Sequence, residues 1–208
     1  QGRYPGIKFP IVLGSDGVGT VEAVGSAVDR NFGIGEVIIN PGWNWGPREA
    51  AQSDQFTILG MPDNGTLAEQ VHVPFRYVHA KPAHLNTIQA AALPLAGVTA
   101  YRGLFSRGQL TTGENVLVTG VGGGVATFAV QYAVAAGAKV FVTSSSPEKI
   151  EQAIQLGATA GFLYTQEDWS KELVAQFGLM DVVYDGAGGI GYSNLIEAAR
   201  PGGRIVNY

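Results

Sequence analysis

The most constraining feature of this chain is a regular alternation of short β-rich runs with helical runs from about residue 91 onward. Such alternation is typical of a parallel sheet that is covered by helices on both faces. The expected strands are Asn115–Thr119, Lys139–Ser144, Gly161–Tyr164, Asp181–Asp185 and Arg204–Tyr208. We therefore predict a doubly wound α/β fold for this part of the chain.

Helices are expected between these strands. Apolar residues at three- and four-residue spacing over 125–136 predict a helix with one buried face. Ser146 and Pro147 supply an N-cap and a first-turn proline, so a second helix should begin there. Two further helices are expected at 168–177 and 190–200.

The first third of the chain has a different pattern. Glycine-punctuated β runs occur at 17–25, 35–42 and 65–73, and helical periodicity is weak. We expect a separate β-rich domain here. The chain then enters an apolar helix, before which Asn86 and Gln89 resemble a capping pair.

Composition limits the classes of partner. The formal net charge is −4 with no basic cluster, which argues against nucleic acid. The chain has no cysteine, so disulfides and thiolate chemistry are excluded within it. No apolar run is long enough to span a membrane, and the amino end lacks the layout of a signal peptide. We expect a cytoplasmic protein.

The first β run of the α/β part leads into a glycine-rich turn, "VLVTGVGGGVATF", and then into the first helix. Unpaired N–H groups at a helix start bind anions, and a side chain there would block the approach. The strict G-x-G-x-x-G spacing is absent, but the register Val121-x-Gly123-x-x-Ala126 keeps the central glycine and a small third residue. Glycines can also serve only to make a turn. The flanking strands and helix favour dinucleotide binding.

The second strand bears on which dinucleotide binds. An acid at its end would hold both ribose hydroxyls of NAD, but this strand ends in three serines, beginning with Ser144. Lys149 follows in the next helix and could oppose a 2′-phosphate. The alternative is that Ser146 is only a cap and Lys149 only a solvated lysine. The missing acid favours NADP(H) over NAD(H).

Several motifs resemble the medium-chain dehydrogenase/reductase superfamily, in particular its zinc-free quinone oxidoreductase-like branch. They include "LGSDGVGTVEAVG", "NGTLAEQVHVP", "AAALPLAGVTAY", "YDGAGG" and "PGGRIV", in the family's order. The resemblance implies a partial GroES-like catalytic domain at 1–92 and a partial Rossmann NAD(P)-binding domain at 93–208. It also implies that family segments would precede Gln1 and follow Tyr208, so that the chain is truncated at both ends.

The resemblance further implies cofactor-binding residues. Thr99 is similar to the threonine beside the nicotinamide, and Gly186 and Ala187 to the stretch at the nicotinamide ribose. The pyrophosphate turn would be Gly123, Gly124 and Val125. The residues around the adenosine ribose phosphate would be Ser144, Lys149 and Tyr164. Tyr164 could equally be a buried strand tyrosine.

Zinc-dependent relatives carry a histidine ligand in a G-H-E motif, where this chain has Gly14-Ser15-Asp16. A later cysteine ligand would align at Leu95, and neither serine nor leucine is a credible replacement. We therefore expect no zinc. Asp16 is expected to accept backbone hydrogen bonds. The histidines are expected at the surface or in strands; they are His72, His79 and His84.

A loop-like stretch over 40–61 contains Trp43, Trp45 and Arg48, which could line a substrate cleft. The alternative is aromatic packing within a long loop.

Together these features predict an NADPH-dependent, metal-independent oxidoreductase that passes hydride to a quinone or an α,β-unsaturated carbonyl. The catalytic hydrogen-bond donors are not identified. The alternatives are an alcohol dehydrogenase-like carbonyl reductase, and a nucleotide-binding protein with a structural or regulatory role. The expected partner is a small-molecule substrate, and a homodimer is possible.

Overall fold

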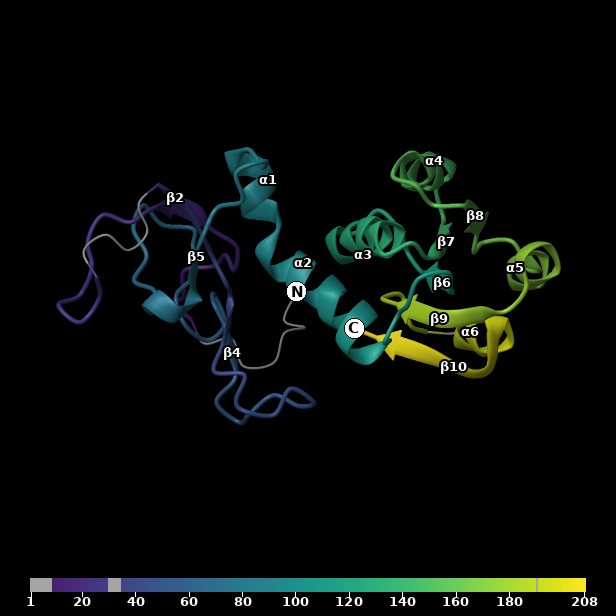
Figure 1. Cartoon of the computed structure of the whole chain (residues 1–208), viewed down its shortest axis with the longest axis horizontal. Coiled ribbons are helices and arrows are strands. Elements are labelled where there is room, and N and C mark those ends of the chain that lie inside the picture. Colours follow the sequence, from purple (N-terminus) through teal and green to yellow (C-terminus); the bar gives the residue numbers. More distant parts are fainter. Residues whose placement is uncertain (1–8, 30–34, 190) are drawn as a thin grey trace. The chain divides into compact units, whose positions relative to one another are not determined.

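The computed structural model describes residues 9–29, 35–189 and 191–208. The chain divides into two compact units, Gln1–Leu95 and Ala96–Tyr208, which are drawn in Figure 1. Within the described residues, no helix is both long and apolar enough to cross a bilayer.

The first unit is built mainly from short antiparallel strands. One sheet has the order β1-β2-β5, and a separate pair joins β3 to β4. The bounds are β1 (Val18–Thr20), β2 (Glu36–Ile39), β3 (Gly42–Trp43), β4 (Thr57–Ile58) and β5 (Val78–Ala80), with the 3₁₀ turn η1 at Phe75–Tyr77. The expected β-rich character of this unit is thus present.

The predicted β run at 65–73 was wrong, because no strand forms there. Instead the N–H groups of Gly65, Thr66 and Leu67 donate to carbonyls of residues 12–14. Gly65 makes this possible, since a Cβ there would lie 2.0 Å from the carbonyl oxygen of Gly14. The two segments therefore meet as an irregular close pairing rather than as a ladder.

Two short helices follow the β-rich part of the chain. These are α1 (Thr87–Ala92) and α2 (Pro94–Tyr101), which is continued by the π-helical segment η2 (Arg102–Arg107). The predicted capping pair is confirmed: Asn86 Oδ1 accepts from the N–H of Gln89, and Gln89 Oε1 accepts from that of Asn86. Pro94 begins a new helix because it lacks an N–H donor.

The second unit contains a five-stranded, fully parallel sheet in the order β10-β9-β6-β7-β8. Counted from β6, this is the order 3-2-1-4-5 of a Rossmann sheet. The strands are β6 (Asn115–Val118), β7 (Lys139–Ser144), β8 (Ala160–Leu163), β9 (Met180–Asp185) and β10 (Ala199–Asn207). The predicted α/β fold is confirmed.

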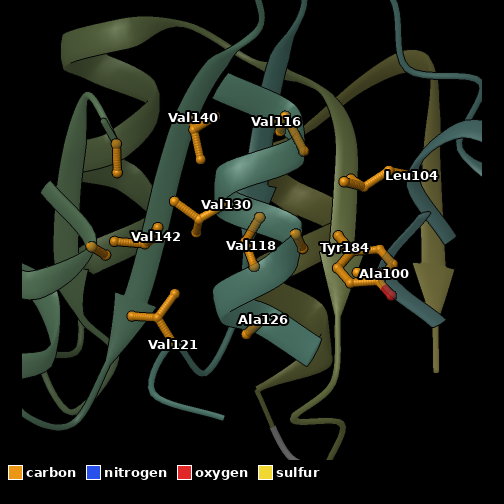
Figure 2. Close-up of a cluster of buried hydrophobic side chains, with 14 of the residues drawn as sticks. Ala100, Leu104, Val116, Val118, Val121, Ala126, Val130, Val140, Val142 and Tyr184 are labelled. Carbon is orange, nitrogen blue, oxygen red and sulfur yellow. The ribbon is translucent and has the colours of Figure 1, made fainter. Parts of the chain in front are cut away.

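Helices cover both faces of this sheet (Figure 1). They are α3 (Gly124–Ala135), α4 (Pro147–Gln155), α5 (Trp169–Phe177) and α6 (Tyr192–Ala198). Figure 2 shows the core on the α3 face, where Ala126 and Val130 of the helix lie with Val118 of β6 and Val142 of β7. A second core on the opposite face joins α5 and α6 to the sheet through Trp169, Leu173 and Leu195, among others.

The helix expected at 190–200 is shorter than predicted. Residue 190 lies outside the described residues, and α6 ends at Ala198. Ala199 already pairs with Met180 in the sheet. Pro201 explains the early end, because the residue before a proline is disfavoured in the helical region.

Candidate functional site

The turn between β6 and α3 is tied to the end of β7. Gly120 N donates to Thr143 Oγ1 at 3.3 Å, and Val121 N donates to the Thr143 carbonyl at 2.9 Å. Ser144 Oγ donates to the Val121 carbonyl at 3.4 Å, and Ser144 is buried. The hydroxyl of Ser144, a predicted cofactor-binding residue, is therefore directed into the turn.

The glycines of this turn serve different purposes. Gly120 and Gly122 have φ of +65° and +112°, which L side chains rarely adopt. Gly123 has φ −84° and ψ 155°, an ordinary extended conformation. A Cβ on Gly123 would meet no atom within 4 Å, and one on Gly124 would make only ordinary contact. Neither backbone conformation nor packing requires glycine at 123.

The turn opens directly onto the amino end of α3. Gly123 is the N-cap and no side chain caps the helix. The first N–H groups of any helix have no intrahelical partner, so those around Gly124 and Val125 are donors that face the turn. The helix dipole adds partial positive charge at this end. These donors, with open space above Gly123, form a cradle suited to an anionic group.

Lys149 contributes a cation beside the same turn. A Cβ on Gly122 would lie 2.5 Å from Lys149 Cδ and 3.2 Å from Nζ, so the lysine side chain lies across Gly122. Among the described residues, its ammonium makes no ion pair within 4.0 Å. Ser146 is confirmed as the N-cap of α4, since its Oγ accepts from Lys149 N. That same hydroxyl donates to Glu148 Oε2 at 2.5 Å.

The loop after β9 is organised by a buried carboxylate. Asp185 is 1% exposed and accepts from Thr119 Oγ1 at 2.5 Å and from Asn207 Nδ2 at 2.8 Å. It also accepts from the N–H groups of Ala187 and Gly188 at 3.2 and 3.1 Å. These bonds fix the loop that contains the predicted residues Gly186 and Ala187. Ala187 lies near the glycine turn, because a Cβ on Gly120 would be 3.9 Å from its Cβ.

A pocket of about 340 Å³ lies at the carboxyl ends of the parallel strands. Its lining includes Thr119, Thr143, Tyr164, Asp185, Ala187 and Asn194. This is the edge at which α/β sheets bind ligands, and the volume is within the range of small-molecule sites. Tyr164 is 47% exposed and follows the end of β8, so its alternative interpretation as a buried strand tyrosine was wrong.

Thr99 lies in α2 and is partly buried. Its carbonyl accepts from the Tyr184 hydroxyl at 3.1 Å, which ties α2 to β9. Burial raises the pKa of Tyr184 above its usual range, so the phenol stays protonated and donates this bond.

Asp16 and Leu95, which lie at or beside the family's zinc-ligand positions, contact each other. Asp16 Oδ1 accepts from Leu95 N at 2.7 Å, which confirms the expected backbone-acceptor role. Burial raises the pKa of Asp16, and the bond from Leu95 offsets this in part. The apolar side chain of Leu95 cannot ligate a metal. Over 9–29, 35–189 and 191–208, no three His, Cys, Asp or Glu side chains gather where they could hold a metal ion. His72, His79 and His84 are all exposed.

The two tryptophans of the 40–61 loop pack within the first unit. Trp43 stacks on Tyr77 with ring centroids 5.5 Å apart, and its Nε1 donates to the Asn40 carbonyl. Trp45 meets Phe56 edge to face, and its Nε1 donates to the carbonyl of Arg48, whose side chain is exposed. Both indoles therefore have structural partners, in agreement with the alternative of aromatic packing within the loop.

Sequence reasoning missed Thr119, Thr143 and Asp185, although all three line the pocket. A signal was present in "YDGAGG", where an acid ends an apolar strand immediately before glycines. Such a carboxylate must be paired when it is buried, and the glycines after it allow their N–H groups to approach.

Two family models match the chain. Residues 1–83 match the alcohol dehydrogenase GroES-like domain, and residues 124–208 match the zinc-binding dehydrogenase model. The chain is 37% identical over 225 residues to the zinc-type alcohol dehydrogenase-like protein YogA of Leptosphaeria maculans, covering 100% of this chain and 63% of the relative. It is 34% identical to a quinone oxidoreductase of Pseudomonas aeruginosa, covering 100% of this chain and 58% of that protein.

The crystal structure of an NAD-dependent alcohol dehydrogenase superposes with a TM-score of 0.91 at 36% identity. That match covers 98% of this chain and 62% of the solved chain. The chain thus spans about three fifths of the length of these similar proteins. Both halves match in the expected order, and the chain belongs to the medium-chain dehydrogenase/reductase superfamily.

Proposed function

We propose that this chain forms the cofactor-binding part of an NADPH-dependent oxidoreductase that reduces a quinone or an α,β-unsaturated carbonyl without a metal. The main support for the proposal is the glycine at position 123. Neither the backbone conformation nor the neighbouring atoms require a glycine there, and the residue lies at the start of α3, where no side chain caps the helix. A ligand that approaches the backbone closely accounts for it.

In this proposal each part of the site has its own task. The N–H groups at the start of α3 bind the pyrophosphate, and Lys149 opposes the 2′-phosphate of the adenosine ribose. Tyr164 and Ala187 line the pocket at the carboxyl ends of the strands. Thr99 and the loop that begins at Gly186 orient the nicotinamide end. The bound cofactor supplies the hydride.

The chemistry of the acceptor follows from the residues at the ligand positions. Ser15 and Leu95 leave no credible metal ligand pair, so the developing oxyanion must be met by hydrogen-bond donors. A quinone or a conjugated carbonyl tolerates weak donors, because the charge that hydride addition creates is delocalised. The quinone oxidoreductase relative supports this choice.

A second candidate is an alcohol dehydrogenase-like carbonyl reductase. The names of the YogA relative and of the NAD-dependent alcohol dehydrogenase structure favour it. The NADPH-dependent quinone or enone reductase agrees better with Ser15 and Leu95, which are not credible metal ligands. It also agrees better with the end of β7, where the chain has three serines, Ser144, Ser145 and Ser146, rather than an acid.

Cofactor preference is tested at Lys149. We expect Lys149→Ala to weaken the binding of NADPH about tenfold or more, because a charge-assisted contact contributes about 1.5–3 kcal/mol. The affinity for NADH should fall by less than about twofold, since NADH has no 2′-phosphate. Calorimetric titration of both cofactors measures the difference. The matched control is Lys139→Ala, at the opposite end of β7, which should change neither affinity. Equal losses for NADPH and NADH in Lys149→Ala would show that Lys149 does not contact the phosphate.

A further inference from the structure

Two tyrosines form a stack at the carboxyl end of the sheet. The rings of Tyr184 and Tyr208 lie 4.7 Å apart between centroids and 18° from parallel. Tyr184 is the penultimate residue of β9, and Tyr208 directly follows β10. Tyr184 is fully buried, whereas Tyr208 is 47% exposed. The stack therefore reaches from the core to the sheet edge at which ligands bind.

The inner end of the stack contacts the helical segment that contains Thr99. The Tyr184 hydroxyl donates to the Thr99 carbonyl, and Figure 2 shows the Tyr184 side chain beside Ala100 in the core. Gly103 lies against the same ring, since a Cβ there would be 2.1 Å from Tyr184 Cε2. Glycine is unfavourable inside a helix by about 1 kcal/mol relative to alanine. Gly103 thus makes room for the ring.

The outer end of the stack covers Gly186. A Cβ on Gly186 would lie 2.3 Å from both Cζ and the hydroxyl oxygen of Tyr208. Gly186 has no positive φ, so its backbone conformation does not require glycine. The close approach of the Tyr208 ring is what requires a glycine at this position. Backbone bonds hold this arrangement, because Tyr208 N donates to the Asp185 carbonyl and Gly186 N donates to Thr119 Oγ1.

A continuous series of contacts therefore runs from Thr99 through Tyr184 and Tyr208 to Gly186. Its two ends are the segments assigned to the nicotinamide in the proposed function, and they are 87 positions apart in the chain (186 − 99). We propose that Tyr184 and Tyr208 are positioning residues that fix Thr99 and the Gly186–Ala187 loop around the nicotinamide ring. This inference rests on the proposed function and extends it to residues that need not touch the cofactor.

The protonation states agree with this role. Burial, and to a smaller extent the neighbouring Tyr208, raise the pKa of Tyr184. Burial and the charge of Asp185 raise the pKa of Tyr208. Both phenols therefore remain neutral at physiological pH, and Tyr184 keeps its donor for Thr99.

The test uses the full-length protein that carries this chain. Tyr184→Phe removes one hydroxyl and keeps the ring. We expect its kcat for NADPH-dependent reduction to fall about tenfold, because misplacement of the reacting groups slows hydride transfer. Its KM for NADPH, and its Kd for 2′,5′-ADP, which lacks the nicotinamide, should stay within about twofold, since the phosphate contacts are unchanged. Tyr208→Leu, which removes the stacked ring, should likewise lower kcat and leave the KM for NADPH and the Kd for 2′,5′-ADP nearly unchanged.

The matched control is Tyr132→Phe, which removes the hydroxyl and keeps the ring of a partly buried tyrosine that packs against Phe128 on α3 in the same unit. It should leave kcat unchanged. The inference is overturned if Tyr184→Phe and Tyr208→Leu lower the melting temperature but keep the wild-type kcat, calculated per protein molecule that binds 2′,5′-ADP. It is also overturned if kcat and 2′,5′-ADP affinity fall together. A wild-type protein that binds neither NADPH nor 2′,5′-ADP would instead contradict the proposed function itself.

Discussion

Replacing Gly123 with valine is expected to abolish measurable binding of NADPH without unfolding the protein. The valine side chain would occupy the space above the α3 amino end and prevent the phosphates from reaching its N–H groups. Loss of two charge-assisted hydrogen bonds of about 1.5–3 kcal/mol each lowers affinity more than about 100-fold. The melting temperature should fall by no more than about 2–4 °C, the cost of valine in place of glycine at an N-cap, because Gly123 has an extended backbone and no neighbour within 4 Å of an added Cβ. Calorimetric titration and thermal unfolding measure the two quantities.

Gly137→Val is the reciprocal control. Gly137 follows the carboxyl end of α3 with φ +77°, and an added Cβ would lie 3.0 Å from Thr112. This variant should lower the melting temperature while the folded fraction keeps its NADPH affinity. If Gly123→Val binds NADPH as tightly as the wild type, the turn is not the phosphate site.

The second large effect is expected at Asp185. Asp185→Ala leaves four donors without their acceptor: the buried hydroxyl of Thr119, the side-chain amide of Asn207, and the N–H groups of Ala187 and Gly188. We expect the free energy of unfolding to fall by about 3 kcal/mol, and the melting temperature by roughly 6–12 °C. Thermal unfolding with and without NADPH measures both this loss and the stabilisation that cofactor binding adds.

Asp168→Ala is the matched control for Asp185. Its carboxylate pairs with Lys171 at 2.6 Å, but both side chains are largely exposed. Exposed pairs contribute about 0–1 kcal/mol, so this change should have little effect. Equal destabilisation by the two variants would contradict the assignment of Asp185 as the organiser of the loop.

The fold could be predicted wherever local pattern and tertiary packing agree. The β7 strand is buried from Val140 to Ser144 because the sheet is covered on both faces, and the expected bounds Lys139–Ser144 match the structure. The N-caps Asn86 and Ser146 were predictable because capping depends on residues only a few positions apart. The end of α6 was mispredicted because helical periodicity outweighed the signal from Pro201.

The candidate site could be predicted only in part. The glycine turn and Lys149 are visible in the sequence, but their proximity depends on how α4 returns beside the turn. The direction of a side chain cannot be read from the sequence, so the burial of Ser144 was not foreseen. The Tyr184–Thr99 bond joins residues 85 positions apart, and no local pattern indicates it.

The reaction is identified by turnover of the full-length protein against a panel of small quinones, enals and simple alcohols, with and without a chelator. We expect oxidation of NADPH by quinones or enals at a rate that the chelator does not change, and hardly any oxidation of ethanol with NADP⁺. Robust alcohol oxidation that the chelator abolishes, with no reduction of quinones or enals, would contradict the proposed function.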